Sequence, residues 1–435
     1  MAEALDAPAH PAAAGAVATE PAPGRAAPWR RLARIETFRS LREHPNFRLY
    51  WCGALTSNVG TWTQTVAQGW LVYQLTGSTF MLGVVGFVQS LPFLLFALYG
   101  GVLADRLERR RLMVWTQIGM MVLAFLLALL TLTGLVVVWH VLVIVFLNGI
   151  VNAFNTPVRQ SIVSDLVPRK DLANAIAINS TQFQSSRTLG PALAGVLLAA
   201  VGPGWCFFLN GVSFVAVIWT LLVMQVPALP PRPRPPALQS VREALVYVRG
   251  HALIWTLLLA AGIPSLFGMA YMFLLPAFAE TVLDAGPAGL GVLQSAVGIG
   301  ALAGALTIAS LPARWRGGAT MLAALVVLGL ALAAFGASQA FVLSVAALFA
   351  VGFSQMVYNN LRMTFVQGLA ADEMRGRVLS LLTLATFGLQ PLGAIEAGAL
   401  AGVIGPGLAM LLNGGVCLVL GVLVWARSPR LRALQ

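Results

Sequence analysis

The sequence predicts an all-α membrane protein of twelve transmembrane helices, arranged as two parallel-repeated six-helix halves. Three observations support this prediction: the composition, the distribution of basic residues and an internal repeat. Of the 435 residues, 58% are hydrophobic and only 10% are charged, whereas a soluble globular domain carries about 25% charged residues. So few charges cannot cover a surface that faces water, and we therefore expect most of the surface to contact the lipid bilayer.

Apolar runs interrupted by Gly, Pro or charged residues predict the individual helices, at about 20 apolar residues per span. In chain order they cover residues 47–74, 79–104, 112–134, 140–162, 173–200, 205–226, 252–281, 288–312, 319–337, 340–366, 377–403 and 406–426. Residues 29–44 mix apolar side chains with arginines, a pattern typical of a short interfacial helix. The five prolines in 230–236 predict a stiff, extended linker.

The predicted helices divide the chain into five parts. Residues 1–45 form a disordered tail with the interfacial helix, and 46–226 form the N-terminal six-helix half. A Pro-rich cytoplasmic linker at 227–250 includes a short amphipathic helix near 240–249. Residues 251–427 form the C-terminal six-helix half, and 428–435 form the C-terminal tail.

The basic residues predict the orientation. Except for Arg187, all 27 Lys and Arg residues lie in the tails, at one set of helix ends, or in the connections after even-numbered helices. Positive charge is retained on the cytoplasmic side of membrane proteins. We therefore expect a multi-pass protein of the cell inner membrane with both termini in the cytoplasm. The net charge of +12 is spread between apolar runs rather than gathered in one patch, so we expect no nucleic acid partner.

The repeat defines the two halves. At a shift of 203 residues, 187–211 aligns without gaps to 390–414, and both segments contain a Gly-Pro-Gly turn and an Asn-Gly pair. Scattered Leu, Ala and Val matches arise by chance between apolar helices, but Gly, Pro and Asn in register do not. A parallel repeat is expected when two halves rock about a central site.

One loop and three further stretches carry a family resemblance. Residues 101–111 (GVLADRLERRR) resemble the loop 2–3 signature of the major facilitator superfamily, with Glu108 where the pattern usually has Gly. Residues 60–77 and 153–175 resemble the branch that contains enterobactin exporters and drug:proton antiporters. Many members of this branch have an Asp where this chain has Gly69. Residues 189–195 resemble the helix-5 motif of antiporters, here Gly190, Pro191 and Gly195, which favours export.

This resemblance suggests a cytoplasmic gate. We hypothesise that Asp105, Arg109 and Arg375 or Arg377 form a latch between the halves that holds the outward-facing state. Gly101 would permit close helix packing, and Asp105 would lie at a helix N-terminus, where an anion is favoured. The alternative is a basic loop that only sets topology. The predicted gate residues are Gly101, Asp105, Arg106, Arg109, Arg110, Arg375 and Arg377.

Polar residues within the helices predict a substrate cavity. Several fall on one stripe of their helix at about 100° per residue, and polar side chains facing lipid are costly. The stripes therefore face either a wet cavity or a neighbouring helix through hydrogen bonds, and in the resembling superfamily helices 1, 4, 7 and 10 line the cavity. The predicted cavity residues are Asn58, Thr61, Thr65, Gln68, Asn148, Asn152, Asn155, Gln355, Tyr358 and Asn359. Arg159 and Arg362 lie near helix ends, where they could serve only as snorkelling anchors.

Two ionisable residues lie deep in predicted spans, Arg187 and Glu396. Intramembrane charges are functional candidates by default. We hypothesise that Glu396 couples transport to protons, that Arg187 binds a substrate anion or is structural, and that Glu280 is the reserve coupling residue.

These features predict a secondary active transporter. The sequence contains no phosphate-binding loop, no metal-ligand cluster and no nucleophile–base pair, so we expect no enzyme activity, cofactor or metal. The leading hypothesis is a monomer that exports a small organic molecule, drug-like or siderophore-like, in exchange for protons by alternating access. An importer or facilitator on the same fold is the alternative, and a non-transporting scaffold or sensor is a third. Fold alone does not identify the substrate.

Overall fold

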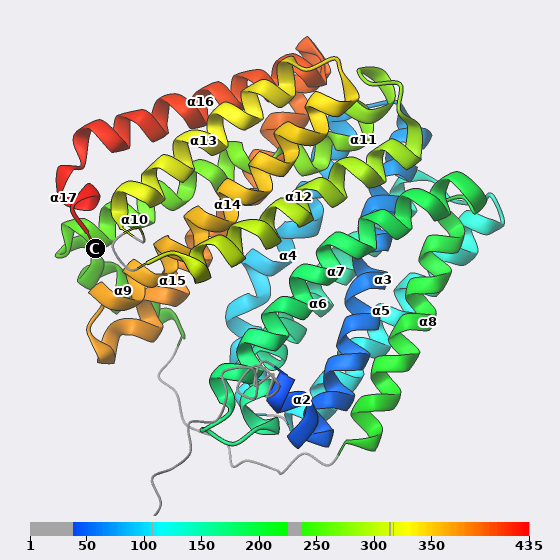
Figure 1. The fold of residues 1–435 in the computed structure, drawn as a ribbon. Helices are drawn as coiled ribbons and strands as arrows, with labels where there is room; N and C mark the ends of the chain where they lie inside the picture. The colour runs from blue at the N-terminus through cyan, green and yellow to red at the C-terminus, as the bar shows by residue number, and fades with distance from the viewer. Residues whose placement is uncertain (1–37, 107, 225–236, 313–314, 316, 435) are drawn as a thin grey trace, which may run out of the picture.

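Twelve membrane-length helical segments form the bundle and confirm the predicted fold class (Figure 1). The computed structural model describes residues 38–106, 108–224, 237–312, 315 and 317–434. Within these residues the helices are α2 (Arg39–Glu43), α3 (Pro45–Thr76), α4 (Thr79–Arg106), α5 (Arg109–Leu132), α6 (Val138–Leu166), α7 (Leu172–Val201), α8 (Pro203–Val223), α9 (Ala237–Arg249), α10 (Ala252–Ile263), η2 (Pro264–Gly268), α11 (Tyr271–Thr281), α12 (Gly286–Ser310), α13 (Gly318–Ala337), α14 (Phe341–Leu369), α15 (Asp372–Ile404), α16 (Pro406–Arg427) and α17 (Pro429–Arg432). The tail before residue 38 and linker residues 225–236 lie outside this description.

Hydropathy alone identifies ten of these segments as membrane spans within the described residues. The other two, α3 and α7, are 32 and 30 residues long but carry Thr, Gln, Asn and Ser along their length. Length lets them cross the bilayer, at about 1.5 Å of rise per residue. Their polarity marks them as interior helices, because polar groups facing lipid are costly.

The seventh span differs from the single helix predicted over 252–281. It is interrupted by η2, a π-helical turn that begins at Pro264, between α10 and α11. Proline has no N–H to donate, and π turns are frequent at functional sites. Residues just after the interruption, such as Tyr271 and Met272, lie between the two halves of the molecule.

The start of α15 also differs from the prediction. The helix begins at Asp372 rather than near residue 377, with Asp372 and Glu373 in its first turn. Two acids at a helix N-terminus are stabilised by the helix dipole, so the charged residues extend the helix instead of ending it.

The repeat is visible in matching turns. Gly202 and Gly405 both adopt positive φ, 83° and 85°, and each is followed by a proline in the first turn of the next helix. Glycine adopts this backbone region without a Cβ penalty. The shared turn explains why the Gly-Pro-Gly segments stay in register across the repeat.

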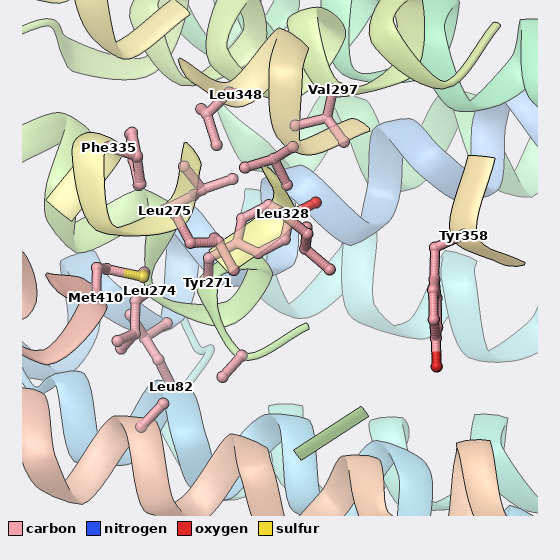
Figure 2. Close-up of a cluster of buried hydrophobic side chains, with 14 of the residues drawn as sticks. Leu82, Tyr271, Leu274, Leu275, Val297, Leu328, Phe335, Leu348, Tyr358 and Met410 are labelled. Carbon is pink, nitrogen blue, oxygen red and sulfur yellow. The ribbon is translucent and has the colours of Figure 1, made fainter. Parts of the chain in front are cut away.

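The two halves of the bundle pack most closely where α4 meets α15 and α7 meets α12. We call the end where α3 begins and α16 ends the terminal face, and the other end the opposite face. One hydrophobic cluster spans both halves and includes the residues drawn in Figure 2, whereas a separate cluster around Phe47, Tyr50 and Phe214 belongs to the N-terminal half alone. The ribbons of the two halves diverge toward the terminal face (Figure 1).

Two symmetric glycine pairs hold the halves together near the opposite face. A Cβ on Gly83 of α4 would lie 3.0 Å from the Cα of Gly398 of α15, and one on Gly195 of α7 would lie 2.9 Å from the Cα of Gly291 of α12. Repeat shifts of 208 and 203 residues relate Gly83 to Gly291 and Gly195 to Gly398. The pairs are therefore copies of one contact, in which backbones of opposite halves touch because no side chain separates them.

The short helix α2 is attached to the start of α7. The Asp171 carboxylate lies 3.0 Å from His44 Nε2 and 3.6 Å from Arg39 Nε, and Ser40 Oγ donates to Asn174 Oδ1 at 2.7 Å. The hydrogen bond from His44 lowers the pKa of the Asp171 carboxyl below its usual range. The attachment therefore needs the ionised form, and it weakens only as the pH falls through that lowered pKa.

The glycine seam generates a first prediction. Gly398→Val should separate the halves at the opposite face, because overpacking costs about 1–3 kcal/mol, equivalent to a shift in population of about 5–150-fold. Spin labels at Leu135→Cys and Gln339→Cys, exposed residues of opposite-face loops in the two halves, would report the distance in a cysteine-free background. Gly415→Val is the control, since nothing lies within 4 Å of its added Cβ. An unchanged distance distribution in Gly398→Val would contradict the seam.

Candidate functional site

A small cavity of about 10 Å³ lies between the halves, midway along the helices. It is bordered by one cation, two aromatic rings, one amide and four apolar side chains. These residues are Trp62 of α3, Arg187 and Pro191 of α7, Tyr271, Met272 and Leu275 of α11, and Gln294 and Val297 of α12. We call it the central cavity. Figure 2 shows Tyr271, Leu275 and Val297 gathered at this junction.

Arg187 is the charged group of the central cavity. Its guanidinium carbon lies 5.7 Å from the centre of the Trp62 ring, and Nη2 donates to Gln355 Oε1 of α14 at 3.4 Å. Gln355 Nε2 in turn contacts Met269 Sδ at 2.6 Å. Among the described residues no carboxylate forms an ion pair with Arg187. The cation therefore bridges the halves through neutral partners alone.

A second cavity, of about 60 Å³, lies within the N-terminal half. Of the predicted cavity residues, Asn58, Thr61, Asn152 and Asn155 border it, together with Arg159. Arg159 Nη1 donates to Asn58 Oδ1 at 3.3 Å, and its guanidinium lies 5.4 Å from the centre of the Phe183 ring. We call it the N-half cavity.

Asn155 both borders a cavity and forms hydrogen bonds with a neighbouring helix, the two roles considered for the polar stripes. It borders the N-half cavity, yet its side chain is 4% exposed. Its Oδ1 accepts hydrogen bonds from Thr116 Oγ1 at 3.1 Å and from Gln117 Nε2 at 3.4 Å, both on α5. The residue therefore ties α6 to α5 while its helix carries the cavity wall.

The other predicted cavity residues lie elsewhere. Thr65 donates to its own helix at the Thr61 carbonyl, as a membrane threonine commonly does. Gln68 is buried, and Tyr358 packs in the C-terminal half with its hydroxyl turned away from the residues around Tyr271 (Figure 2). Asn148, Gln68, Tyr358 and Asn359 border neither cavity.

Arg362 is the most deeply buried arginine of the described spans. The residue is 6% exposed, and Nε and Nη1 have no hydrogen-bond partner among the described residues. Its guanidinium carbon lies 5.2 Å from the centre of the Tyr358 ring, and the Tyr358 hydroxyl also lacks a partner there. This burial argues against a snorkelling anchor, whose charged head would reach the interface.

The two carboxylates predicted for proton coupling are separate from the central cavity. Glu396 of α15 accepts a hydrogen bond from Asn413 Nδ2 of α16 at 3.1 Å. It shares a stripe of α15 with the exposed residues Leu392 and Val403, at the edge of the α15–α16 contact. Glu280 is exposed near the end of α11, at the opposite face.

The predicted gate residues with described side chains make contacts inside their own half. Arg109 pairs with Asp165 at 2.7 Å, and Arg110 donates to the carbonyls of Leu221 and Leu222 at the end of α8. Arg375 pairs with Asp372 at 2.6 Å, and Arg377 pairs with Glu243 of α9 at 2.6 Å. Arg375 lies in the first turn of α15 and Arg377 in the second. Gly101, Asp105 and Arg106 belong to α4, but their side chains lie outside the described ones.

The helix-5 motif packs against both halves. A Cβ on Gly190 would meet Trp62 Cβ and would lie 2.9 Å from the Val59 carbonyl of α3, and the Gly190 carbonyl accepts from Thr63 Oγ1 at 3.0 Å. The next residue, Pro191, borders the central cavity. About one turn further along α7, Gly195 meets Gly291 of the other half. The motif therefore connects the cavity wall to the seam.

One group of residues has the spacing of a metal site, namely Glu43, His44 and Asp171. Arg39 lies 3.1 Å from Glu43 and 3.6 Å from Asp171. A guanidinium between the two carboxylates occupies the acceptor oxygens that a cation would need. The arrangement is an ion-pair network.

Several cavity residues were not predicted from sequence. Trp62, Gln294 and Val297 border the central cavity, and Tyr50 and Gln117 border the N-half cavity. Gln117 and Gln294 are amide side chains within largely apolar runs, each beside one hydroxyl residue, and this polarity is the one signal that could have identified them. Trp62 and Val297 give no such signal, because apolar side chains are normal in a membrane helix.

Comparison with known proteins agrees with this geometry. A family described as transmembrane secretion effector matches residues 35–434. The enterobactin exporters EntS of Citrobacter koseri and of Escherichia coli are each 28% identical over 402 residues, covering 91% of this chain and 94% of theirs.

Two solved structures share the fold. A peptide transporter POT variant in complex with sulfate gives a TM-score of 0.75 at 14% identity, covering 89% of this chain and 95% of that one. A bacterial homologue of the lysosomal transporter Spinster, in an inward-facing and unoccupied conformation, gives 0.68 at 16% identity, covering 89% and 97%. With twelve spans, a repeated half and a cavity between the halves, the chain belongs to the transmembrane secretion effector family of the major facilitator superfamily and is a multi-pass membrane transporter rather than an enzyme.

Proposed function

We propose that this protein exports a small organic molecule across the inner membrane in exchange for protons, acting as a monomer with both termini in the cytoplasm and no nucleic acid partner. The central cavity carries the proposal. It lies between the halves at mid-membrane, where superfamily folds bind substrate, and the closest packing of the halves is on the opposite-face side of it. The basic residues gathered at the terminal face support a cytoplasmic position for that face.

The cavity and the seam support alternating access. The glycine pairs bring the halves into backbone contact between the central cavity and the opposite face, while the ribbons of the halves diverge toward the terminal face. A rocking motion would bring the halves together at the terminal face and separate them at the opposite face, around a fixed site. The substrate would contact Arg187, Trp62 and Tyr271 in the central cavity. Asn58 and Asn152 would contribute polar contacts in the N-half cavity, and Gln355 would hold Arg187 in place.

The direction of transport rests on two lines of support. The relatives described above are named as enterobactin exporters. The Gly190–Pro191 motif, whose Pro191 borders the central cavity, resembles the helix-5 motif of antiporters, which favours export. An importer would use the same cavity but would move the substrate in the opposite direction across the membrane.

A transport assay tests direction. Inverted and right-side-out vesicles containing the protein should be given an imposed pH gradient and a panel of labelled organic compounds. An exporter accumulates substrate in inverted vesicles that are acidic inside. Proton-driven accumulation in right-side-out vesicles alone would identify an importer instead, and no gradient-dependent movement of any compound would favour the scaffold alternative.

Proton coupling generates a second prediction. Glu396→Gln should keep the hydrogen bond with Asn413 while removing the ionisable group, so the pH-driven initial rate should fall about tenfold or more with substrate binding retained. Glu373→Gln, at an exposed acid in the first turn of α15, is the matched control. If the rate driven by the pH gradient is unchanged in Glu396→Gln, the same measurement on Glu280→Gln tests the reserve residue.

The proposed latch generates a third prediction with two opposite arms. Asp105→Asn should favour the state open at the terminal face, because it removes the acid that would hold Arg375 or Arg377 across the halves. Glu243→Gln should favour the opposite state, because it frees Arg377 from its partner. Each shift is expected to be about 5–150-fold, read as the labelling rate of a cysteine at Asn152. Identical rates in both variants and the parent would leave only the topology-setting role for the loop.

A further inference from the structure

We propose that the exported molecule is an organic anion with an aromatic or otherwise flat apolar body, and that Arg187 binds its charge in the central cavity. Arg159 and Arg362 would form the approach to this site from the terminal face. The inference deepens the proposed function and rests on it only in treating the bound molecule as cargo.

The first argument is an excess of positive charge within the spans. Among described residues, Arg159, Arg187 and Arg362 form no ion pair, and their contacts are amide oxygens and aromatic rings. By contrast, Arg109 and Arg377, near the helix ends, each pair with a carboxylate at 2.6–2.7 Å. Charges inside a membrane protein are normally paired or mark the path of an ion or substrate. Three cations without an acid indicate a path for an anion.

The second argument comes from the lining of the cavities. Each has an arginine in its wall, Arg187 in one and Arg159 in the other, and the residues that border them include no Asp or Glu. A cation entering either cavity would meet like charge with no counter-charge in the wall. An anion would meet an opposite charge in a medium of low dielectric, where that attraction is strong.

The third argument is a set of buried donors without acceptors. Arg362 Nε and Nη1 have no hydrogen-bond partner in the described part of the chain, and the hydroxyl groups of Tyr271 and Tyr358, which lie beside Arg187 and Arg362, have no acceptor there. Buried polar groups are nearly always hydrogen-bonded, so each exception requires an explanation. Guanidinium and hydroxyl groups share one complementary partner, an oxyanion, which accepts several hydrogen bonds at once.

The arrangement of these groups gives the approach a direction. Gln355 and Arg362 lie seven residues apart on α14 and therefore on one face of it, about two turns apart. Gln355 accepts from Arg187, and Arg362 is nearer the terminal face. Arg159 holds the equivalent position in the first half, since the 203-residue shift relates it to Arg362. The cations thus form a pair nearer the terminal face and a single central site.

The apolar part of the ligand follows from the remaining wall. Trp62 and Tyr271 supply ring faces and edges, and Met272 supplies an adaptable thioether. Aromatic and methionine side chains favour flat or irregular apolar groups. Gln294 is the neutral polar group on the far wall. A small inorganic anion would leave these apolar surfaces without contact.

A matched series of ligands tests the charge preference. The full-length protein in lipid nanodiscs would be titrated with 2-naphthoate, 2-naphthamide and 2-naphthylmethylammonium, which share one ring system and differ in charge. We expect 2-naphthoate to bind at least tenfold more tightly than the other two. Equal or tighter binding of the amide or the ammonium compound, or no binding of any of the three, would overturn the proposal.

Variants assign the effect to Arg187. Arg187→Gln should weaken 2-naphthoate binding at least tenfold, and Arg187→Lys, which keeps the charge but loses the planar fork, should weaken it less and preserve the order of the three ligands. Arg427→Gln, an exposed arginine at the end of α16, is the control and should change nothing. If Arg187→Gln loses its monodisperse profile, the Lys variant decides: reversal of the ligand order would contradict the assignment.

Transport separates this proposal from the proposed function. Binding of 2-naphthoate with no gradient-driven movement of it or of any other compound would leave the anion site standing and refute export. Export of a neutral or cationic compound, with rates unaffected by Arg187→Gln, would leave export standing and refute the anion site.

Discussion

Contact between the two halves depends on two helix crossings at which glycines leave no side chain between the backbones. Lipid is as apolar as leucine, so apolar surfaces gain little by pairing inside a bilayer, and association requires close backbone packing instead. Gly83 with Gly398 and Gly195 with Gly291 provide it. The polar links across this junction are long or single: Thr79 Oγ1 donates to the Gly398 carbonyl at 3.4 Å, and Ser295 Oγ donates to the Thr188 carbonyl at 3.2 Å. A junction formed by close packing with few hydrogen bonds can open in a single step, which would allow the two halves to separate in the proposed cycle.

The fold could be predicted from the sequence because its determinants are local. Apolar length sets the spans, and the Gly-Pro-Gly turns recur with the same positive φ at Gly202 and Gly405. The two differences from the predicted helices, at η2 and at the start of α15, are also local, but each depends on competing effects. Pro264 could have ended the helix, kinked it or widened it, and η2 is the third outcome. Asp372 and Glu373 suggested a loop by their charge, whereas their position at a helix N-terminus makes them stabilising.

The site was less predictable, because it is made by contacts between segments far apart in sequence. The spacing of polar residues along each helix identified Asn58 on α3 and Asn152 and Asn155 on α6 as inward-facing. Three of the four helices that line the N-half cavity, α3, α5 and α6, contribute these residues or their hydrogen-bond partners. Periodicity cannot say which helix lies opposite. Trp62 and Val297 are cavity residues only because α3 and α12, from opposite halves, both border the central cavity. Arg187 was identified because a charge in an apolar run is costly wherever the helix lies.

The two surface helices belong to different halves. His44 and Asp171 fasten α2 to the first half, while Glu243 with Arg377, and Tyr247 Oη accepting from the Ala371 amide, fasten α9 to the second. Both helices carry arginines, among them Arg42 and Arg249. In the proposed rocking motion, a half that tilts would move its own charged helix relative to the lipid headgroups. The thickness and anionic content of the membrane would then enter the energetics of the proposed transport cycle.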